Sequence, residues 1–340
     1  NFSRGYRRCS NLMTKYIRPL IEEYADYVLA GGWCRFTKVE VLQRGKPPSI
    51  CLATDLSKTL LQRLTTPRGN VGLPQMHRAQ VMGILNTTPD SFSDGGKFDT
   101  ILAAEKHLIA MADHGVDIID IGGESTRPGA EFVEAADEIG RTYPVIQALR
   151  KVSSLPVSID TRKAEVADLA IQAGVNWIND VSALSFDSDM VNLVVKEDVP
   201  LCIMHSPLDP KTMQKNANYD NVLLDVYDYL EERLEFAVSQ GVPRTKIIID
   251  PGIGFGKTQD HNLALLRGLA LFHSLGCLIL VGASRKRFIG TISGAEDVNR
   301  RMPGSLAVAL AAVAQGVQFV RVHDVLETVQ ALKLWAAVRC

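Results

Sequence analysis

The sequence predicts an α/β fold, a (β/α)8 TIM barrel with an N-terminal extension. From about residue 80 onwards, short apolar runs alternate with helix-like segments, an order that is typical of parallel α/β folds. Eight such runs span about 260 residues, which matches the usual length of this barrel. Every run also ends in polar residues. Parallel α/β folds place their functional side chains at this end of the strands.

The eight apolar runs are predicted to be the barrel strands. Segments between them carry apolar residues at helical spacing, as at Val166, Leu169, Ala170 and Ala173. A doubly wound open sheet is the alternative architecture, but such sheets usually contain fewer strands. The predicted strands cover residues 81–85, 118–121, 157–159, 177–178, 201–204, 247–249, 278–281 and 319–322.

The composition is that of an ordinary globular protein, with 46% apolar and 22% charged residues among 340. A formal net charge of −1 argues against binding nucleic acid or a membrane through bulk electrostatics. No apolar run approaches the roughly 20 residues needed to cross a bilayer. The six cysteines are scattered without a C-x-x-C pair, which argues against a zinc site or a disulfide framework. We therefore expect a cytoplasmic protein with reduced thiols.

The first part of the chain, residues 1–75, is predicted to be the extension. Residues 1–20 hold five basic side chains and no acidic one, a composition that transit peptides share. No apolar core or small-residue cleavage site follows. We therefore favour Met13 as the natural start, with residues 1–12 upstream of it.

Residues 13–66 contain enough apolar side chains to fold. Pro and Gly residues between positions 67 and 74 mark a boundary, and the barrel domain is predicted to cover residues 78–340. The sequence identifies no chemistry in the extension. We expect it to pack under the N-terminal face of the barrel or at a dimer interface.

Polar side chains follow each predicted strand, and each alone has a structural explanation as a helix cap or turn residue. Together they indicate a site, because barrel closure brings the strand ends into one ring. The ring includes Asn86 after the first strand, residues 122–129 after the second, Asp160 after the third, Asn179 after the fourth, His205 after the fifth, Asp250 after the sixth, residues 284–286 after the seventh, and Arg321 and His323 on the eighth.

The residue types of this ring indicate the kind of ligand. Carboxylates and an amide, at Asp160, Asn179 and Asp250, suit a flat heterocycle that carries several N–H donors. Arg321 and His323 are two residues apart on a strand, so their side chains point to the same face. With Arg127 and Lys286 they supply positive charge for a phosphate or diphosphate. The sequence therefore predicts an acidic part for a heterocycle and a basic part for a phosphorylated group.

Residues 252–258 resemble a phosphate-binding P-loop but do not form one, because Pro251 stands where the motif needs Gly. We interpret the segment as a flexible loop that presents Phe255 to a substrate. The histidines at the strand ends lack zinc-ligand spacing. His205 is predicted to be a core or loop-anchoring residue.

Seven motifs in order resemble the dihydropteroate synthase family of the folate pathway over residues 78–340. They lie at residues 86–96, 122–129, 158–161, 179–182, 250–257, 284–286 and 321–325. The resemblance implies a transferase that joins p-aminobenzoate to 6-hydroxymethyl-7,8-dihydropterin diphosphate. The products would be 7,8-dihydropteroate and diphosphate. Mg²⁺ would be the cofactor, sulfonamides would compete with p-aminobenzoate, and the protein would be a homodimer.

The resemblance also implies a role for each motif residue. The catalytic group would comprise Asp160, Lys286, Arg321 and His323. The loops at residues 87–96 and 125–130 would close over the substrates. The implied ligands are Asp160, Asn179, Asp250 and Lys286 for the pterin; Thr126, Arg321 and His323 for the diphosphate; Thr126, Arg127, Pro128, Phe255 and Ser284 for p-aminobenzoate; and Asn86 for the metal.

Two other functions remain open at this point. A pterin-binding methyltransferase domain that serves a corrinoid protein would use the same barrel and acids, but would have no use for Arg321, His323 and the Asn86 loop. A catalytically silent barrel that binds pterin or a protein partner is the second alternative. Polar residues at all eight strand ends argue against it.

Overall fold

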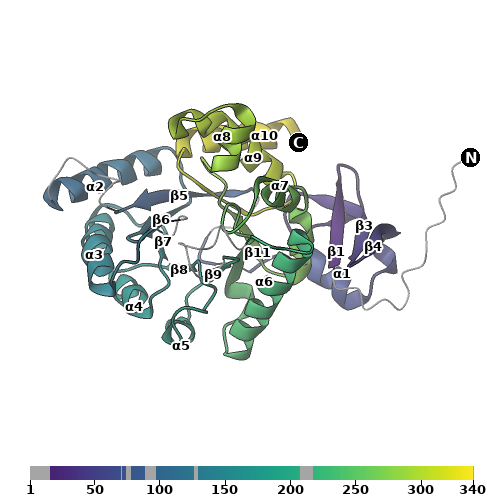
Figure 1. Ribbon diagram of the computed structural model, residues 1–340, viewed down its shortest axis with the longest axis horizontal. Helices are drawn as coiled ribbons and strands as arrows, with labels where there is room; N and C mark the ends of the chain where they lie inside the picture. The colour runs from purple at the N-terminus through teal and green to yellow at the C-terminus, as the bar shows by residue number, and fades with distance from the viewer. Residues whose placement is uncertain are drawn as a thin grey trace, which may run out of the picture.

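The computed structural model describes residues 16–69, 71–73, 78–88, 97–125, 129–206 and 217–339, with the backbone alone for 97–100. Eight parallel strands close into a barrel in which each strand pairs with its neighbours in the sequence (Figure 1). All eight strand predictions are confirmed, and the open-sheet alternative is wrong. The strands are β5 (Gln80–Asn86), β6 (Ile118–Gly122), β7 (Val157–Asp160), β8 (Trp177–Asp180), β9 (Leu201–Met204), β10 (Ile247–Asp250), β11 (Leu278–Val281) and β12 (Phe319–Val322).

Helices surround the barrel and follow the strands in alternation (Figure 1). The predicted helical pattern at Val166–Ala173 falls on α4 and its C-cap. No helix in the described ranges is long and apolar enough to span a membrane. The α-helices are α2 (Lys97–Asp113), α3 (Ala135–Val152), α4 (Ala164–Gln172), α5 (Asp189–Glu197), α6 (Val222–Ser239), α7 (Gln259–Arg267), α8 (Arg287–Ser293), α9 (Met302–Val313) and α10 (Val325–Arg339), and the short 3-10 helices are η3 (Arg244–Lys246), η4 (Leu269–Leu275) and η5 (Val298–Arg301).

The barrel interior is built in layers. Trp177 on β8 and Phe319 on β12 are fully buried in one apolar cluster, with their rings 5.2 Å apart. Two residues further along the same strands stand Asn179 and Arg321. Side chains alternate along a strand, so these polar groups lie on the same inner face, nearer the C-terminal ends. An apolar layer thus supports a polar one.

The extension forms a small folded unit with an antiparallel sheet and one helix. Its strands and helices are β1 (Tyr16–Glu22), β2 (Tyr27–Val28), β3 (Arg35–Gln43), β4 (Lys46–Leu52), η1 (Ala53–Asp55) and α1 (Lys58–Thr65). Ile17, Phe36 and Val39 are buried in a core separate from that of the barrel. The prediction that residues 13–66 fold is confirmed for the part from residue 16, whereas Met13 and residues 1–12 lie outside the described residues.

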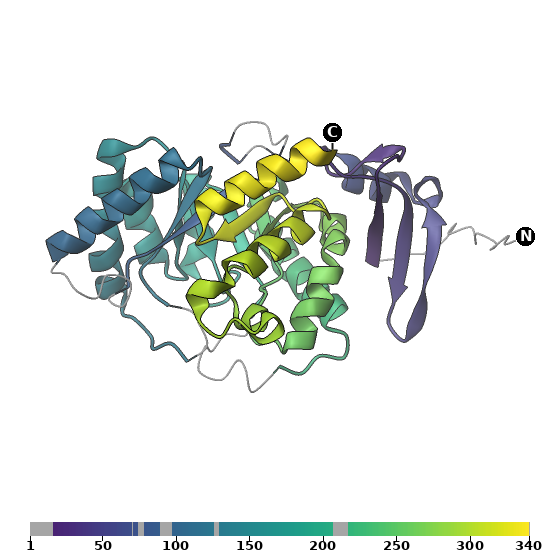
Figure 2. The same cartoon turned by 90° about the horizontal axis from the view of Figure 1, so that it is seen from above.

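The extension packs beside the barrel, near the C-terminal end of α10 (Figure 2). Trp33 Nε1 donates to the Val313 carbonyl at 2.8 Å, and Arg44 pairs with Asp228 of α6 at 2.7 Å. Val313 ends the helix that precedes β12, so this contact lies on the N-terminal side of the barrel. This contact agrees with the first of the two expected positions, at the N-terminal face, while the dimer interface stays a prediction.

The linker closes the N-terminal end of the barrel. Val71 and Leu73 are buried in the same cluster as Trp177 and Phe319. Trp177 Nε1 donates to the Val71 carbonyl at 2.7 Å. The linker segment 71–73 therefore fills the barrel at its N-terminal end.

Candidate active site

A largely buried ion-pair cluster lies inside the barrel towards the C-terminal ends of the strands. Arg321 donates through Nε to Asp120 Oδ2 at 2.6 Å and through Nη2 to Asp160 Oδ2 at 2.8 Å. Asn179 Nδ2 donates to the same Asp120 oxygen at 3.2 Å. The guanidinium on β12 thus links a carboxylate of β6 with one of β7.

The cluster differs from the sequence prediction in one respect. The sequence predicts Arg321 in the basic part of the ring, yet Arg321 lies against the carboxylates of Asp120 and Asp160. Asp120 was not singled out, because it stands inside the apolar run 118–121. It is fully buried, and in the described part of the chain its Oδ1 has no hydrogen-bond partner. The predicted separation into acidic and basic parts is therefore too simple.

Burial controls the ionisation of these groups. It raises the pKa of Asp160 to about 7, although the charge of Arg321 opposes this effect. Burial would lower the pKa of Arg321, but the charges of Asp120 and Asp160 outweigh it and raise that pKa above its usual range. The guanidinium therefore stays charged, and Asp160 titrates near neutral pH.

Asp250 occupies a neighbouring position at the end of β10. Its Oδ1 accepts a hydrogen bond from Gly252 N at 2.7 Å. Burial raises its pKa to about 6, opposed by that hydrogen bond and by the charge of Lys286. Gly282 leaves room beside it, because a Cβ there would lie 3.8 Å from both Asp250 Oδ2 and Arg321 Cβ.

The segment after β11 carries Ser284 and Lys286. Between them Arg285 adopts φ +56°, a left-handed conformation that costs a non-glycine residue free energy. Its backbone N donates to Ser305 Oγ at 2.9 Å, and its side chain pairs with Asp324. These two contacts of Arg285 hold the neighbouring Ser284 in place. Ser284 Oγ accepts a hydrogen bond from His323 N at 3.2 Å and forms a second one with His323 Nδ1 at 3.0 Å.

The loop after β10 is braced from within. Lys257 is buried, and its Nζ donates to the carbonyls of Gly252 and Phe255, each at 2.9 Å. It also lies 2.8 Å from Nδ1 of His205. Burial lowers the pKa of His205 well below its usual value, so Nδ1 of the neutral ring accepts from the lysine. His205 is a loop-anchoring residue as predicted, but the loop itself is held in place rather than flexible.

Phe255 in the loop after β10 contacts the Lys286 side chain. Lys286 Nζ lies 3.9 Å from the centre of the Phe255 ring, within the range of a cation–π contact. The charge of Lys286 also acts on Asp250, where it opposes the rise in pKa that burial causes. Phe255 and Lys286, predicted for different substrates, therefore meet at one edge of the site.

Comparison with known proteins agrees with this geometry. Residues 82–323 match the family described as pterin binding enzyme. A dihydropteroate synthase of Clostridium beijerinckii is 46% identical over 258 residues, covering 76% of this chain and 93% of that protein. The chain belongs to the dihydropteroate synthase family.

Solved structures of this synthase family match the fold as well. The Xanthomonas albilineans dihydropteroate synthase with 4-aminobenzoic acid has a TM-score of 0.76 and 43% identity, covering 81% of this chain and 98% of that one. The Yersinia pestis synthase in a sulfonamide drug complex has a TM-score of 0.74 and 41% identity, covering 78% and 96%. These relatives favour the synthase over the corrinoid methyltransferase and the silent barrel.

The glycine-rich synthase motif after β6 rests on a buried charge network. Glu124 accepts from Arg162 at 3.0 Å and from Lys163 at 2.7 Å, and Lys163 also binds Glu138 at 2.6 Å. Burial alone would raise the pKa of Glu124, but Arg162 and Lys163 lower it below its usual value. Glu124 also accepts from Val133 N at 3.1 Å, so it ties together both ends of the segment 125–132.

Several predicted synthase residues lie outside the described residues. They are Thr126, Arg127 and Pro128, together with most of the predicted closing loop at 87–96. The base of the second closing loop is described on both sides, at Ser125 and from Gly129 onwards.

Asn86 ends β5 at the rim of the barrel. A Cβ at Gly122 would lie 3.8 Å from Asn86 Oδ1 and 3.7 Å from Asp160 Oδ2, so these two oxygens flank the same gap. No cluster of three or more His, Cys, Asp or Glu among the described residues could hold a metal ion alone. Mg²⁺ usually takes one or two protein oxygens and completes its shell with water and substrate phosphates. A single amide oxygen at the mouth fits that pattern.

Proposed function

We propose that the polar layer at the mouth of the barrel catalyses the dihydropteroate synthase reaction. p-Aminobenzoate would attack 6-hydroxymethyl-7,8-dihydropterin diphosphate, giving 7,8-dihydropteroate and diphosphate. The observation that carries the proposal is the cluster of Asp120, Asp160 and Asn179 around Arg321, buried at the C-terminal strand ends. It stands in a chain whose relatives are dihydropteroate synthases.

The pterin would bind in the acidic layer. Asp160, Asn179 and Asp250 offer oxygens to its ring N–H and amino groups, and Lys286 offers a donor. Asp120 Oδ1 is buried without a partner in the described part of the chain. A buried acceptor without a donor costs about 1–3 kcal/mol. A pterin N–H group directed at this oxygen would recover that free energy.

The diphosphate would bind above this layer, towards Arg321, His323 and Thr126. Arg321 has five N–H donors, of which the bonds to Asp120 and Asp160 use two. Its other donors can therefore bind diphosphate oxygens without releasing the carboxylates. Arg321 would thus link the pterin and diphosphate ends of one substrate.

Asn86 would hold Mg²⁺ at the rim, together with diphosphate oxygens and water. The metal supplies positive charge that neutralises the leaving diphosphate. Removing divalent cations with a chelator should abolish turnover but leave pterin binding to the acidic layer intact.

The second substrate, p-aminobenzoate, would lie at the outer edge of the polar layer, against Phe255, Ser284 and residues 126–128. The 4-aminobenzoic acid in the Xanthomonas structure and the sulfonamide in the Yersinia complex support a site for both kinds of molecule. Sulfonamides would compete with p-aminobenzoate here.

The chemistry needs no dedicated base before bond formation. An arylamine is neutral at pH 7, so the C–O bond to the diphosphate can ionise first. The negative charge of Asp160 would stabilise the cation that develops on the pterin methylene. Closure of the two loops would keep water away from this cation. The amine then forms the C–N bond and loses its proton.

We also propose a homodimer in the cytoplasm. Leu334 and Val338 lie one turn apart on α10 and are 68% and 78% exposed, which favours burial against a second copy. The four cysteines in the described ranges are buried thiols, as suits a reducing compartment.

A product assay tests the proposed function. The purified chain is incubated with dihydropterin diphosphate, p-aminobenzoate and Mg²⁺, and dihydropteroate and diphosphate are measured together. Equal amounts of both products are expected. Formation of neither product would overturn the proposal, and methyl transfer to a corrinoid would support the alternative.

A further inference from the structure

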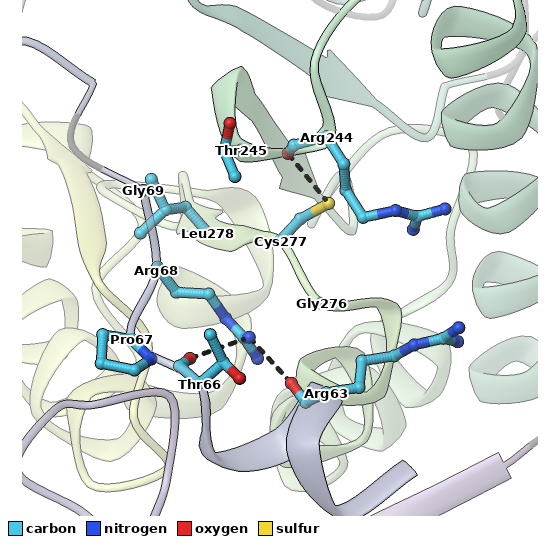
Figure 3. Close-up of a pocket in the computed structure, with 10 residues that line it drawn as sticks. All are labelled: Arg63, Thr66, Pro67, Arg68, Gly69, Arg244, Thr245, Gly276, Cys277 and Leu278. Carbon is cyan, nitrogen blue, oxygen red and sulfur yellow. Dashed lines mark hydrogen bonds between the residues drawn. The ribbon is translucent and has the colours of Figure 1, made fainter. Parts of the chain in front are cut away.

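A pocket of about 220 Å³ is lined by residues that precede β10 and β11, at the N-terminal ends of these strands (Figure 3). It is formed where the linker after α1 meets the segments that lead into β10 and β11. Its walls include Arg63 and Arg68 from the extension side, and Arg244 and the Gly276 turn from the barrel. The pocket is therefore shared between the two folded units.

Three guanidinium-bearing side chains line this pocket, and none of the described lining residues is acidic. Within the described residues, Arg68 donates only to backbone carbonyls, those of Arg63 at 2.8 Å, Thr66 at 3.3 Å and His273 at 2.9 Å. Its Nε is buried and lacks a hydrogen-bond partner in the described part of the chain. Arg68 as a whole is half-buried, but a charged side chain with a buried, unpaired donor and only neutral partners is an unusual arrangement, because buried charges are normally paired.

The other two arginines converge on the Gly276 turn. A Cβ at Gly276 would lie 3.1 Å from Arg63 Cγ and 3.9 Å from Arg244 Cδ. Both side chains extend on the same side of that turn (Figure 3). Arg63 Nη1 donates to the Ser274 carbonyl at 3.5 Å, and Arg244 Nη1 to the Leu275 carbonyl at 3.0 Å. Arg244 also pairs with Glu235, the one carboxylate bonded to this group of arginines in the described ranges.

The positive charge of Arg68 is costly where it lies. Burial lowers the pKa of Arg68 to about 10, and the charge of Arg63 adds to this effect. A negatively charged ligand between these side chains would offset both. The hydroxyl-bearing residues Thr66 and Thr245 also line the pocket and could donate to its oxygens.

We propose that this pocket is a second anion site, which binds the phosphate group of a small molecule through Arg63, Arg68 and Arg244. Its volume of about 220 Å³ is below the roughly 300–1,000 Å³ of ordinary small-molecule sites, so it suits a phosphate rather than a whole nucleotide. Arginine is the side chain best suited to bind phosphate through several N–H donors at once. Because the ligands come from both units, the anion would fasten the extension to the barrel.

The position of the site separates it from the proposed reaction. Arg244 and Gly276 precede β10 and β11, whereas Asp250 and Ser284 stand at or beyond the other ends of the same strands. The proposal therefore does not depend on dihydropteroate synthase activity.

Equilibrium dialysis with radiolabelled inorganic phosphate at constant ionic strength tests the proposal. The variants are Arg63→Gln/Arg244→Gln and, as a matched control, Arg35→Gln, an exposed arginine of the same extension. The double variant should bind one phosphate fewer per chain than the wild type, and the control should bind the same number. A phosphate bound in the proposed reaction site would remain in all three proteins, so the two sites are counted separately.

A single-residue variant distinguishes a loss of phosphate binding from a folding defect in the double variant. Arg63→Gln alone removes a half-buried side chain with one 3.5 Å hydrogen bond, and it should weaken phosphate binding at this site at least tenfold. Phosphate should also raise the melting temperature of the wild type more than that of Arg63→Gln. Unchanged stoichiometry in the double variant, or equal affinity in wild type and Arg63→Gln, would overturn the proposal.

Discussion

Asp160 and Asp250 are carboxyl groups that lie in the mouth of the barrel with few protein donors. Burial raises both of their pKa values, to about 7 and about 6. Such groups destabilise the free protein when they are charged, and a ligand that donates hydrogen bonds to them offsets this cost. Sites of this kind lower stability in exchange for binding.

Asp250→Asn should stabilise the free protein at pH 8 and abolish dihydropteroate formation. The unfolded chain has its Asp pKa near 3.8 and the folded chain near 6. Between these values the folded state binds more protons, so the free energy of unfolding of the wild type falls as pH rises. The variant lacks this fall and should be more stable at pH 8 by about 1–3 kcal/mol. The gain should vanish below about pH 4.

Urea denaturation without ligands at pH 4 and pH 8 measures this difference. Asp113→Asn, at an exposed position at the end of α2, is the matched control and should change little at either pH. A gain for Asp250→Asn that is equal at both pH values would contradict the assigned cause.

Lys257→Met should destabilise the protein by about 2–4 kcal/mol, since it leaves buried carbonyls of the β10 loop without a donor. Because the loop carries Phe255 and follows Asp250, the KM of both substrates should rise. Steady-state kinetics and urea denaturation give the two readouts. Lys196→Met, at an exposed ion pair on α5, should leave both unchanged. A Lys257→Met variant that is fully active and as stable as the wild type would show that the hydrogen bonds of Lys257 to the loop are dispensable.

The linker between the extension and the barrel fills the N-terminal end of the barrel with apolar side chains. Leu73 is 4% exposed and packs among side chains of the barrel interior. Leu73→Ala should cost about 2–4 kcal/mol, measured by urea denaturation. Ile50→Ala on β4, where the side chain is 48% exposed, should cost far less. Similar losses of unfolding free energy in the two variants would show that Leu73 is not part of the barrel core.

Helix α10 is the element proposed to bring two copies together. Leu334→Glu combined with Val338→Glu would place two charges in that interface, so sedimentation velocity should show a monomer. The fold should be retained, because both side chains are largely exposed within one chain. A wild-type chain that is already monomeric at micromolar concentration would refute the dimer proposal.

Local patterns in the sequence predict the barrel strands, since each strand is a short apolar run ended by polar residues. The ring residues Asp160, Asn179, Asp250 and Arg321 follow from the same pattern. Asp120 was missed because its neighbours make the run look uniformly apolar, although alternation along β6 places it on the inner face. Lys257 contacts His205, which follows β9, and no local pattern in the sequence reveals this contact.

On the scale of the whole molecule, the two ends of the barrel have different tasks. The C-terminal end holds the buried carboxylates around Arg321. The N-terminal end is filled by Val71 and Leu73 and borders the arginine pocket that joins the extension. The extension lies on that side and beside α6, where Arg44 pairs with Asp225 and Asp228. Stability and binding can therefore be changed separately by substitutions at the two ends.

The comparison of Asp120→Asn with Asp117→Asn tests whether the polar layer around Arg321 is the active site. Asp120 faces Arg321 inside the barrel, whereas Asp117 pairs with Arg78 before the start of the same strand. We predict that kcat/KM for dihydropteroate formation falls about 10- to 100-fold in Asp120→Asn, since a charge-assisted bond is worth about 1.5–3 kcal/mol. Asp117→Asn should remain within a few-fold of the wild type. Equal rates for Asp120→Asn and the wild type would contradict the placement of the active site in this polar layer.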